Sequence, residues 1–144
     1  MKDLIVKNVD TLKGEKIVSD GNEFTEKKII TDSEISKCRV NFVEIEPGNY
    51  AYGYHYHEAN EEVFYFISGT GVVRTLSGDI KVKAGDVIGF PTGEKGVHVV
   101  KNESGTEKLV YIDFGTTNLP EIAHLPDVNK IMVIGKEVNC VYDK

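Results

Sequence analysis

Two of the four histidines, His55 and His57, stand one residue apart in the segment GYHYHEANEEVF. In an extended strand this spacing places both imidazole rings on the same face. Glu61 and Glu62 follow a short turn and would begin the antiparallel return strand, opposite the two histidines. Two imidazole nitrogens and one carboxylate oxygen that converge form half of a transition-metal site. A stripe of solvated histidines on the surface is the other interpretation that this segment allows.

A second segment, GDVIGFPTGEKGVHVVKN, carries another histidine and favours the metal site. Its Gly-Asp turn leads into a short strand that Pro91 ends, and a glycine-rich loop then reverses the chain. His98 falls on the strand that follows this loop. It would complete a set of three imidazole nitrogens and one carboxylate oxygen.

Short strands must position these side chains, because the sequence from residue 38 onward consists of brief Val-, Ile-, Phe- and Tyr-rich runs separated by Gly, Pro and Asn. Many short strands, frequent turns and the lack of a helical stripe predict an all-β sandwich or barrel. No stretch between strands is long enough for the crossover helix of a βαβ unit. The expected strands span residues 40–45, 51–56, 63–67, 72–76, 80–83, 87–90, 97–101, 109–114, 131–134 and 138–142.

The composition fits one globular domain of 144 residues, with 40% hydrophobic and 28% charged residues. The net charge of −6 argues against nucleic acid or an anionic membrane as a partner, since both require a basic face. No apolar run approaches the roughly 18 residues of a membrane span, and the start MKDLIVKNVD lacks the pattern of a signal peptide. We therefore expect a cytoplasmic protein in which Cys38 and Cys140 are unpaired thiols.

The first histidine segment resembles the first motif of the cupin superfamily. That motif runs Gly, His-x-His, three or four residues, Glu, six residues and Gly. Here it reads Gly48, His55-Tyr56-His57, Glu62 and Gly69. The gap between Gly48 and His55 is six residues rather than five, and it falls in a turn where an extra residue is tolerated.

The segment around His98 resembles the second cupin motif, which runs Gly, five residues, Pro-x-Gly, two residues, His, three residues and Asn. The matching residues are Gly85, Pro91, Gly93, His98 and Asn102. The gap between Gly93 and His98 is four residues rather than two, and it also falls in a turn, where extra residues leave the ligands intact. The resemblance covers roughly residues 40–114.

The resemblance implies an all-β fold, a double-stranded β-helix barrel of the jelly-roll kind. It also implies that four metal ligands point into the lumen of this barrel. Because the family's carboxylate ligand stands six residues before the closing glycine, the ligand is Glu62 and Glu61 is a solvated turn residue. The alternation of a strand then places Phe64 and Phe66 in the lumen as well. The implied metal ligands are His55, His57, Glu62 and His98.

We expect one domain with three parts. Residues 1–36 form an N-terminal arm or edge strands, residues 37–116 form the barrel core with both motifs, and residues 117–144 form a C-terminal linker and an edge strand. His124 lies in this last part, where no second ligand accompanies it, and we expect it on the surface.

The donor set implies one divalent transition metal, and three imidazoles with one carboxylate suit Fe, Mn, Ni, Co or Zn. Open coordination positions would let the ion act as a Lewis acid, as in an isomerase or lyase, or bind a substrate together with O₂, as in a dioxygenase. Tyr111, Asp113 and Glu61 are unconvincing as a general base, which favours oxygen chemistry. A non-catalytic protein that binds a small ligand, such as a sugar or an aromatic acid, through the metal is the alternative.

Two further residues are weak catalytic candidates. Arg74 lies in the middle of a strand, where it could clamp a substrate anion or form an outward salt bridge. Tyr111 could donate a hydrogen bond to a ligand or pack as an ordinary core tyrosine.

The strand that carries His55 and His57 also predicts a contact between subunits. If both histidines face the lumen, alternation places Tyr52, Tyr54 and Tyr56 on the outer surface. Three neighbouring aromatic rings call for cover, so we predict a homodimer; cover by the N-terminal arm is the alternative.

Overall fold

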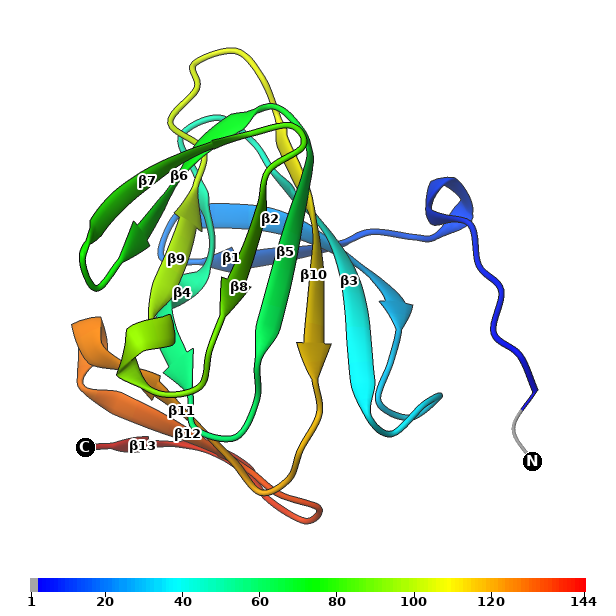
Figure 1. The fold of residues 1–144 in the computed structure, drawn as a ribbon, viewed down its shortest axis with the longest axis vertical. Helices are drawn as coiled ribbons and strands as arrows, with labels where there is room; N and C mark the ends of the chain where they lie inside the picture. Colours follow the sequence, from blue (N-terminus) through cyan, green and yellow to red (C-terminus); the bar gives the residue numbers. More distant parts are fainter. Residues whose placement is uncertain (1–2) are drawn as a thin grey trace.

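The computed structural model describes residues 3–144 and contains two antiparallel sheets that face each other across an apolar core (Figure 1). The prediction of an all-β fold is confirmed. Three short 3₁₀ helices interrupt the strands: η1 (Val9–Thr11), η2 (Glu94–Gly96) and η3 (Pro126–Val128). Among residues 3–144, no helix has the length and apolar character needed to span a membrane.

The first sheet has six strands. Its central members, β3, β10 and β5, come from distant parts of the sequence, so the sheet forms only when the chain closes on itself. In spatial order the strands are β1 (Glu15–Ser19), β2 (Asn22–Ile30), β3 (Cys38–Ile45), β10 (Leu109–Thr116), β5 (Glu62–Ser68) and β8 (Val87–Phe90).

The second sheet has seven strands. Its last three members in sequence form a meander that joins the barrel where β11 pairs with β4. In spatial order the strands are β13 (Asn139–Asp143), β12 (Lys130–Ile134), β11 (Glu121–Leu125), β4 (Tyr50–His57), β9 (His98–Lys101), β6 (Thr70–Thr75) and β7 (Gly78–Lys83).

Strand β5 shows the alternation that the sequence predicts. Glu62, Phe64 and Phe66 are buried, whereas the residues between them, Val63 and Tyr65, are exposed. The two buried rings pack against Tyr111 of β10, with centroids 4.9 and 5.4 Å away. An apolar wall therefore stands directly beside the carboxylate of Glu62.

Strand β4 departs from simple alternation, and the prediction for Tyr52 is wrong. Tyr52 has a left-handed backbone with a φ of 61°, and the pairing of β4 with β9 shifts register between Ala51 and His55. This irregularity turns Tyr52 toward the interior, where its ring packs on Phe24 with a centroid distance of 4.7 Å. From Ala51 to His55 strand β4 spans four residue steps against two on β9, so the bulge adds two residues and leaves Ala51 buried.

The other two tyrosines of β4 are covered by side chains of the same chain. The Arg74 guanidinium lies 3.8 Å from the centre of the Tyr54 ring. Tyr56 stacks on His124 with ring centroids 4.4 Å apart. Side chains of the same chain therefore cover the tyrosines from which a homodimer was predicted.

Both ends of the chain add strands to the barrel. Residues 15–30 form the β1–β2 hairpin at the edge of the first sheet, and residues 3–14 run outside the barrel (Figure 1). The orange and red strands β11 to β13 lie across the lower end of the barrel in Figure 1. Cys38 and Cys140 are both free thiols.

Candidate metal centre

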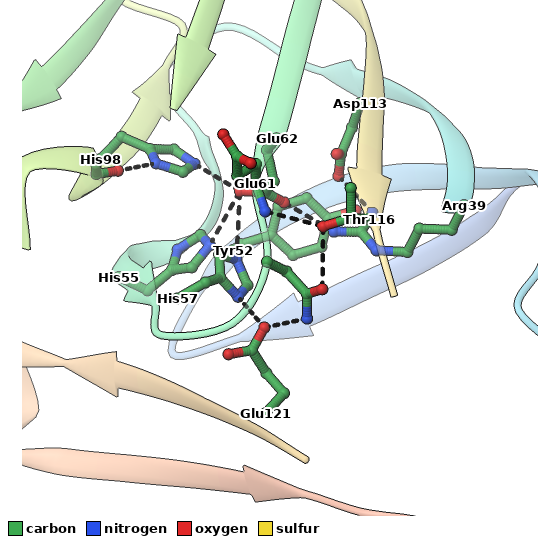
Figure 2. A network of polar contacts seen from close by, with 12 residues as sticks. Arg39, Tyr52, His55, His57, Glu61, Glu62, His98, Asp113, Thr116 and Glu121 are labelled. Carbon is green, nitrogen blue, oxygen red and sulfur yellow. Dashed lines mark hydrogen bonds and ion pairs between the residues drawn. The ribbon is translucent and has the colours of Figure 1, made fainter. Parts of the chain in front are cut away.

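Three strands of the barrel bring together the four residues that the sequence predicts as ligands (Figure 2). His55 and His57 lie on β4, His98 lies on β9 directly opposite His55, and Glu62 is the first residue of β5. The turn 58–61 returns the chain from β4 to β5, as the sequence indicates, and so carries Glu62 over the two imidazoles of β4.

The three imidazoles converge on a single oxygen atom. The Nε2 atoms of His57 and His98 each lie 3.3 Å from Glu62 Oε2, and the Nε2 atom of His55 lies 3.9 Å from it. Donor atoms of His55, Glu62 and His98 all lie within 4.8 Å of one another. His57 borders this group through its own short distance to Glu62, and its side chain is 18% exposed.

The opposite nitrogen of each ring is held by the surrounding structure. His55 Nδ1 lies 2.6 Å from the carbonyl oxygen of Gly53, and His98 Nδ1 lies 2.8 Å from that of Gly96. Because a carbonyl oxygen only accepts hydrogen bonds, each Nδ1 carries the proton and donates it. The Nε2 lone pairs of these two rings therefore point to the centre, as metal-binding histidines require.

The surroundings of His55 and His57 shift their pKa values in opposite directions. Burial, together with the neighbouring His98, lowers the pKa of His55 to about 4, so this ring is neutral. Burial acts in the same direction on His57, but the carboxylates of Glu121 and Glu62, whose oxygens lie 3.4 and 3.3 Å from its ring nitrogens, outweigh it and raise the pKa of His57 to about 9. A cation that binds at the centre would displace this proton, since a metal ligand must be unprotonated.

Several buried polar atoms at the centre have no hydrogen-bond partner. They include Glu62 Oε2 and the Nε2 atoms of His57 and His98. A buried polar atom left unsatisfied costs about 1–3 kcal/mol. A divalent ion among these atoms would satisfy all of them, and a set of nitrogen and oxygen donors without thiolate suits a transition metal. The residues present therefore fit the ion that the sequence implies.

Arg39 of β3 fixes the orientation of the Glu62 carboxylate. Its guanidinium donates to Glu62 Oε1 at 2.7 Å and to Asp113 Oδ2 at 3.1 Å. Oε2 of Glu62 is thereby left free to face the histidines. Gly115 of β10 pairs with Arg39 on one side and with Glu62 on the other. A Cβ atom at Gly115 would lie 3.1 Å from the guanidinium, so the glycine lets Arg39 reach across β10.

Asp113 is the second carboxylate that Arg39 holds. Burial and the nearby charge of Glu62 raise the pKa of Asp113 to about 6, although Arg39 acts against this rise. Arg39 lies outside both sequence motifs, which do not mark it as part of the site. Its position in β3 could have indicated it, because Arg39 has the same strand parity as the buried residues Asn41 and Val43.

Glu121 of β11 supports His57 from the side away from the centre (Figure 2). Its Oε2 atom lies 3.4 Å from His57 Nδ1 and also accepts a hydrogen bond from the amide of Asn60. Its Oε1 atom accepts hydrogen bonds from the backbone N–H groups of Glu58 and Ala59 at 3.1 and 3.0 Å. Glu121 thus fixes both the ligand ring and the turn that leads to Glu62. No motif in the sequence marks this residue.

The two weak catalytic candidates lie in different places. Arg74 is on the outer face, where it forms the outward salt bridge that the sequence allowed, with Asp127 at 2.7 Å. Tyr111 is fully buried beside Phe64, and its hydroxyl has no hydrogen-bond partner. His124 lies outside the centre and pairs with Glu58 at 2.7 Å.

A cavity of about 650 Å³ opens beside the histidines. Its polar wall includes Glu26, Arg39, Asn41 and Tyr52. Another part of its wall is apolar and comes from the C-terminal strands, with Ala123, Leu125, Met132 and Ile134. The cavity is large enough for a small organic molecule whose polar groups face the centre.

Residues 41–115, more than half of the chain, match the family model described as "Cupin domain". An oxalate-binding protein from Thermotoga maritima is 34% identical over 65 residues, which are 45% of this chain and 51% of that protein. The match thus spans about half the length of that relative.

Solved structures share the fold over a greater length. A protein from Acidithiobacillus ferrooxidans, provisionally named a sugar phosphate isomerase, is 25% identical, with a TM-score of 0.81 over 94% of this chain and 87% of that one. A sugar phosphate isomerase of the cupin superfamily from Silicibacter pomeroyi is 22% identical, with a TM-score of 0.83 over 95% and 91%. A predicted oxalate decarboxylase from Thermotoga maritima is 23% identical, with a TM-score of 0.70 over 79% and 100%.

Proposed function

The chain belongs to the cupin family, and we propose that it is a metal-dependent protein that acts on a small molecule. One divalent transition ion (Fe, Mn, Ni, Co or Zn) would bind to His55, His57, His98 and Glu62. The observation that carries this proposal is the convergence of three imidazole Nε2 atoms on one carboxylate oxygen. That oxygen and two of the nitrogens are buried without hydrogen-bond partners.

We propose an enzyme rather than a structural metal site, because an ion that takes five or six ligands keeps one or two coordination positions for another molecule beside four protein ligands. Such an ion polarises the oxygen atoms of a bound compound. The residues of the chain would position the ligands and limit the access of water. Arg39 and Glu121 would hold the metal ligands in place, and the apolar wall formed by β11 and β12 would keep water away from the bound compound. An isomerase, a lyase or a dioxygenase could use this arrangement.

A non-catalytic binding protein is the second candidate, and the relative from Thermotoga maritima favours it. That protein is named for binding oxalate, and its similarity covers 45% of this chain. In such a protein the ion would hold a small oxygen-containing ligand unchanged. Recovery of an intact ligand with the purified protein, and no turnover of candidate substrates by the metal-loaded protein, would favour this second function.

Replacement of His57 by alanine tests the ligand assignment. We expect about one ion per chain in the wild-type protein and almost none in His57→Ala after dialysis, because removal of a ligand weakens metal binding by more than about 100-fold. Elemental analysis of both proteins measures this directly. The matched control is His124→Ala, whose side chain pairs with Glu58 outside the centre and should leave the metal content unchanged. Equal metal content in His57→Ala and wild type would contradict the assignment.

The homodimer stays a proposal. The tyrosines of β4 give it less support than the sequence suggested, since Arg74 and His124 cover two of them. A second apolar surface lies on the outer face of β5 and β8, where the side chains of Val63, Tyr65, Ile67 and Val87 are 40–60% exposed. We propose that a second copy of the chain covers this surface.

A further inference from the structure

Tyr52 adopts a backbone conformation that is unusual for its residue type. It is one of three non-glycine residues with positive φ among residues 3–144, and the other two, Asp20 and Asn129, are residue types that tolerate the left-handed region in turns. Tyr52 instead lies within strand β4. Such a strained conformation is unfavourable, and residues of this kind are concentrated at functional sites. Its consequence here is to turn the Tyr52 side chain from the outer surface into the cavity.

The Tyr52 hydroxyl donates a hydrogen bond to Oε2 of Glu26 on β2. Glu26 is 8% exposed, and within residues 3–144 no cationic side chain forms a salt bridge with it. A buried carboxylate with one neutral donor is costly to keep in a core. The β1–β2 hairpin therefore brings an acid side chain into the barrel without the cation that Asp113 and Glu62 receive from Arg39.

Glu26 and Tyr52 line the same cavity as His55, His57 and Glu62. Figure 2 shows the Tyr52 ring beside the histidine cluster, on the side toward Arg39. A compound held at the metal centre would thus meet the Glu26–Tyr52 pair in the same cavity. Glu26 is a cavity carboxylate that the sequence did not single out, because it lies outside both motifs, in the N-terminal part of the chain.

The charges of the cavity indicate which compounds fit it. Arg39 is the one arginine or lysine among the described residues that line it, and its guanidinium is already bound to Glu62 and Asp113. Among the described residues that line the cavity, no unpaired lysine or arginine is left to hold a phosphate or carboxylate group of a ligand. The remaining polar groups include the amides of Asn41 and Asn139, which suit hydroxyl groups.

We propose that Glu26 is the general base of this cavity, that Tyr52 positions it, and that the ligand is a small uncharged hydroxy-carbonyl compound. This inference rests on the proposed function, because the ion would hold the ligand's oxygen atoms. Glu26 takes the proton from the carbon that bears the hydroxyl group, and the C–H electron pair forms a carbon–carbon double bond. The carbonyl π pair moves to its oxygen, which gives the enediolate.

The reaction then closes without an oxidant or a co-reactant. Glu26 returns the proton to the neighbouring carbon, and the hydroxyl proton passes between the two adjacent oxygens. The product is an isomer of the substrate. With a base in the cavity, the reason for favouring oxygen chemistry over isomerisation is removed.

Acetohydroxamic acid tests this inference without knowledge of the natural substrate. It is small and uncharged, has adjacent oxygens, and loses its hydroxyl proton when it binds a metal through both of them. Titration calorimetry of the metal-loaded protein in buffers of different ionisation enthalpy measures how many protons reach the buffer. We expect almost no release from the wild-type protein, because Glu26 takes the proton, and roughly one proton per site from Glu26→Gln.

Glu61→Gln is the matched control and should behave as the wild-type protein, because Glu61 is an exposed residue beside the cluster. Equal proton release from wild type and Glu26→Gln, with the ion and the hydroxamic acid both bound, would overturn the assignment of the base and leave the proposed function standing. A wild-type protein that binds neither the ion nor the hydroxamic acid would mean that the proposed function itself has failed.

Deuterium exchange provides a second readout with dihydroxyacetone in D₂O, followed by proton NMR. We expect Glu26→Gln to slow the exchange of its carbon-bound protons by about 10²–10⁴-fold, the usual contribution of a general base. Formate should restore part of the exchange in Glu26→Ala, which a purely structural role of Glu26 would not allow. Tyr52→Phe, which removes only the orienting hydrogen bond, should lower the rate less than Glu26→Gln. Exchange at the wild-type rate in Glu26→Gln would overturn the inference.

Discussion

Replacement of Arg39 by methionine should destabilise the metal-free protein by about 3 kcal/mol. The change leaves the carboxylates of Glu62 and Asp113, with side chains 4% and 3% exposed, without their shared cation. We place the loss at the lower end of the range for a broken buried ion pair, because the Arg39 side chain itself retains 29% exposure. Urea unfolding measures the loss as a lower midpoint at an unchanged slope.

The loss should depend on pH, because Arg39 holds down the pKa of Asp113. That pKa is about 6 when Arg39 is present, raised by burial and by Glu62, and it rises further without the arginine. Below the new pKa the Asp113 carboxyl is neutral and needs no cation. The difference between the wild type and Arg39→Met is therefore larger at about pH 8 than at about pH 5.

Arg74→Met is the matched control for Arg39→Met. Arg74 also forms an ion pair, but its side chain and that of Asp127 are 40% and 51% exposed. Exposed pairs contribute little to stability because solvent screens them. Equal losses of unfolding free energy in the two variants would show that Arg39 does not stabilise the buried carboxylates of Glu62 and Asp113.

Replacement of Glu62 by glutamine should lower the affinity for the metal by more than about 100-fold and leave the fold intact. The change removes the anionic oxygen on which the three imidazoles converge. It leaves Arg39 paired with Asp113, so the metal-free protein does not gain an unpaired buried charge. Titration of the metal-free protein with the ion, followed by calorimetry, measures the affinity; urea unfolding measures the stability.

Glu61→Gln separates the two neighbouring glutamates. The Glu61 backbone N–H donates to Thr116, and its side chain is exposed rather than directed at the histidines. We expect its metal affinity to match that of the wild type. A large loss of metal affinity in Glu61→Gln, or no loss in Glu62→Gln, would contradict the assignment of Glu62 as the ligand, which strand parity and motif spacing both favour.

The spacing of residues along the chain, together with the resemblance to the two cupin motifs, predicted the four residues that the structure brings together. The one-residue gap between His55 and His57 places both rings on one face, and the short turn after them returns Glu62 to the same place. The alternation along β5 correctly placed Phe64 and Phe66 in the interior. Local periodicity works here because each of these residues lies in a regular stretch of its strand, and the irregular part of β4 precedes His55.

The supporting residues could not be predicted in this way, because their contacts join distant parts of the chain. Arg39 meets Glu62 across β10, at a position left open by Gly115. Glu121 reaches His57 from a C-terminal strand that no motif includes. Tyr52 was placed on the wrong face because one left-handed residue breaks the alternation of β4, and a tyrosine gives no warning of that conformation.

X-ray absorption spectroscopy of the zinc-loaded protein tests the central claim most directly. It counts the imidazole rings around the ion by their multiple scattering. The account predicts three imidazole nitrogens and one carboxylate oxygen at about 2.0–2.2 Å, with solvent in any remaining position and no sulfur. A spectrum with one imidazole or none, or with a sulfur ligand, would contradict it.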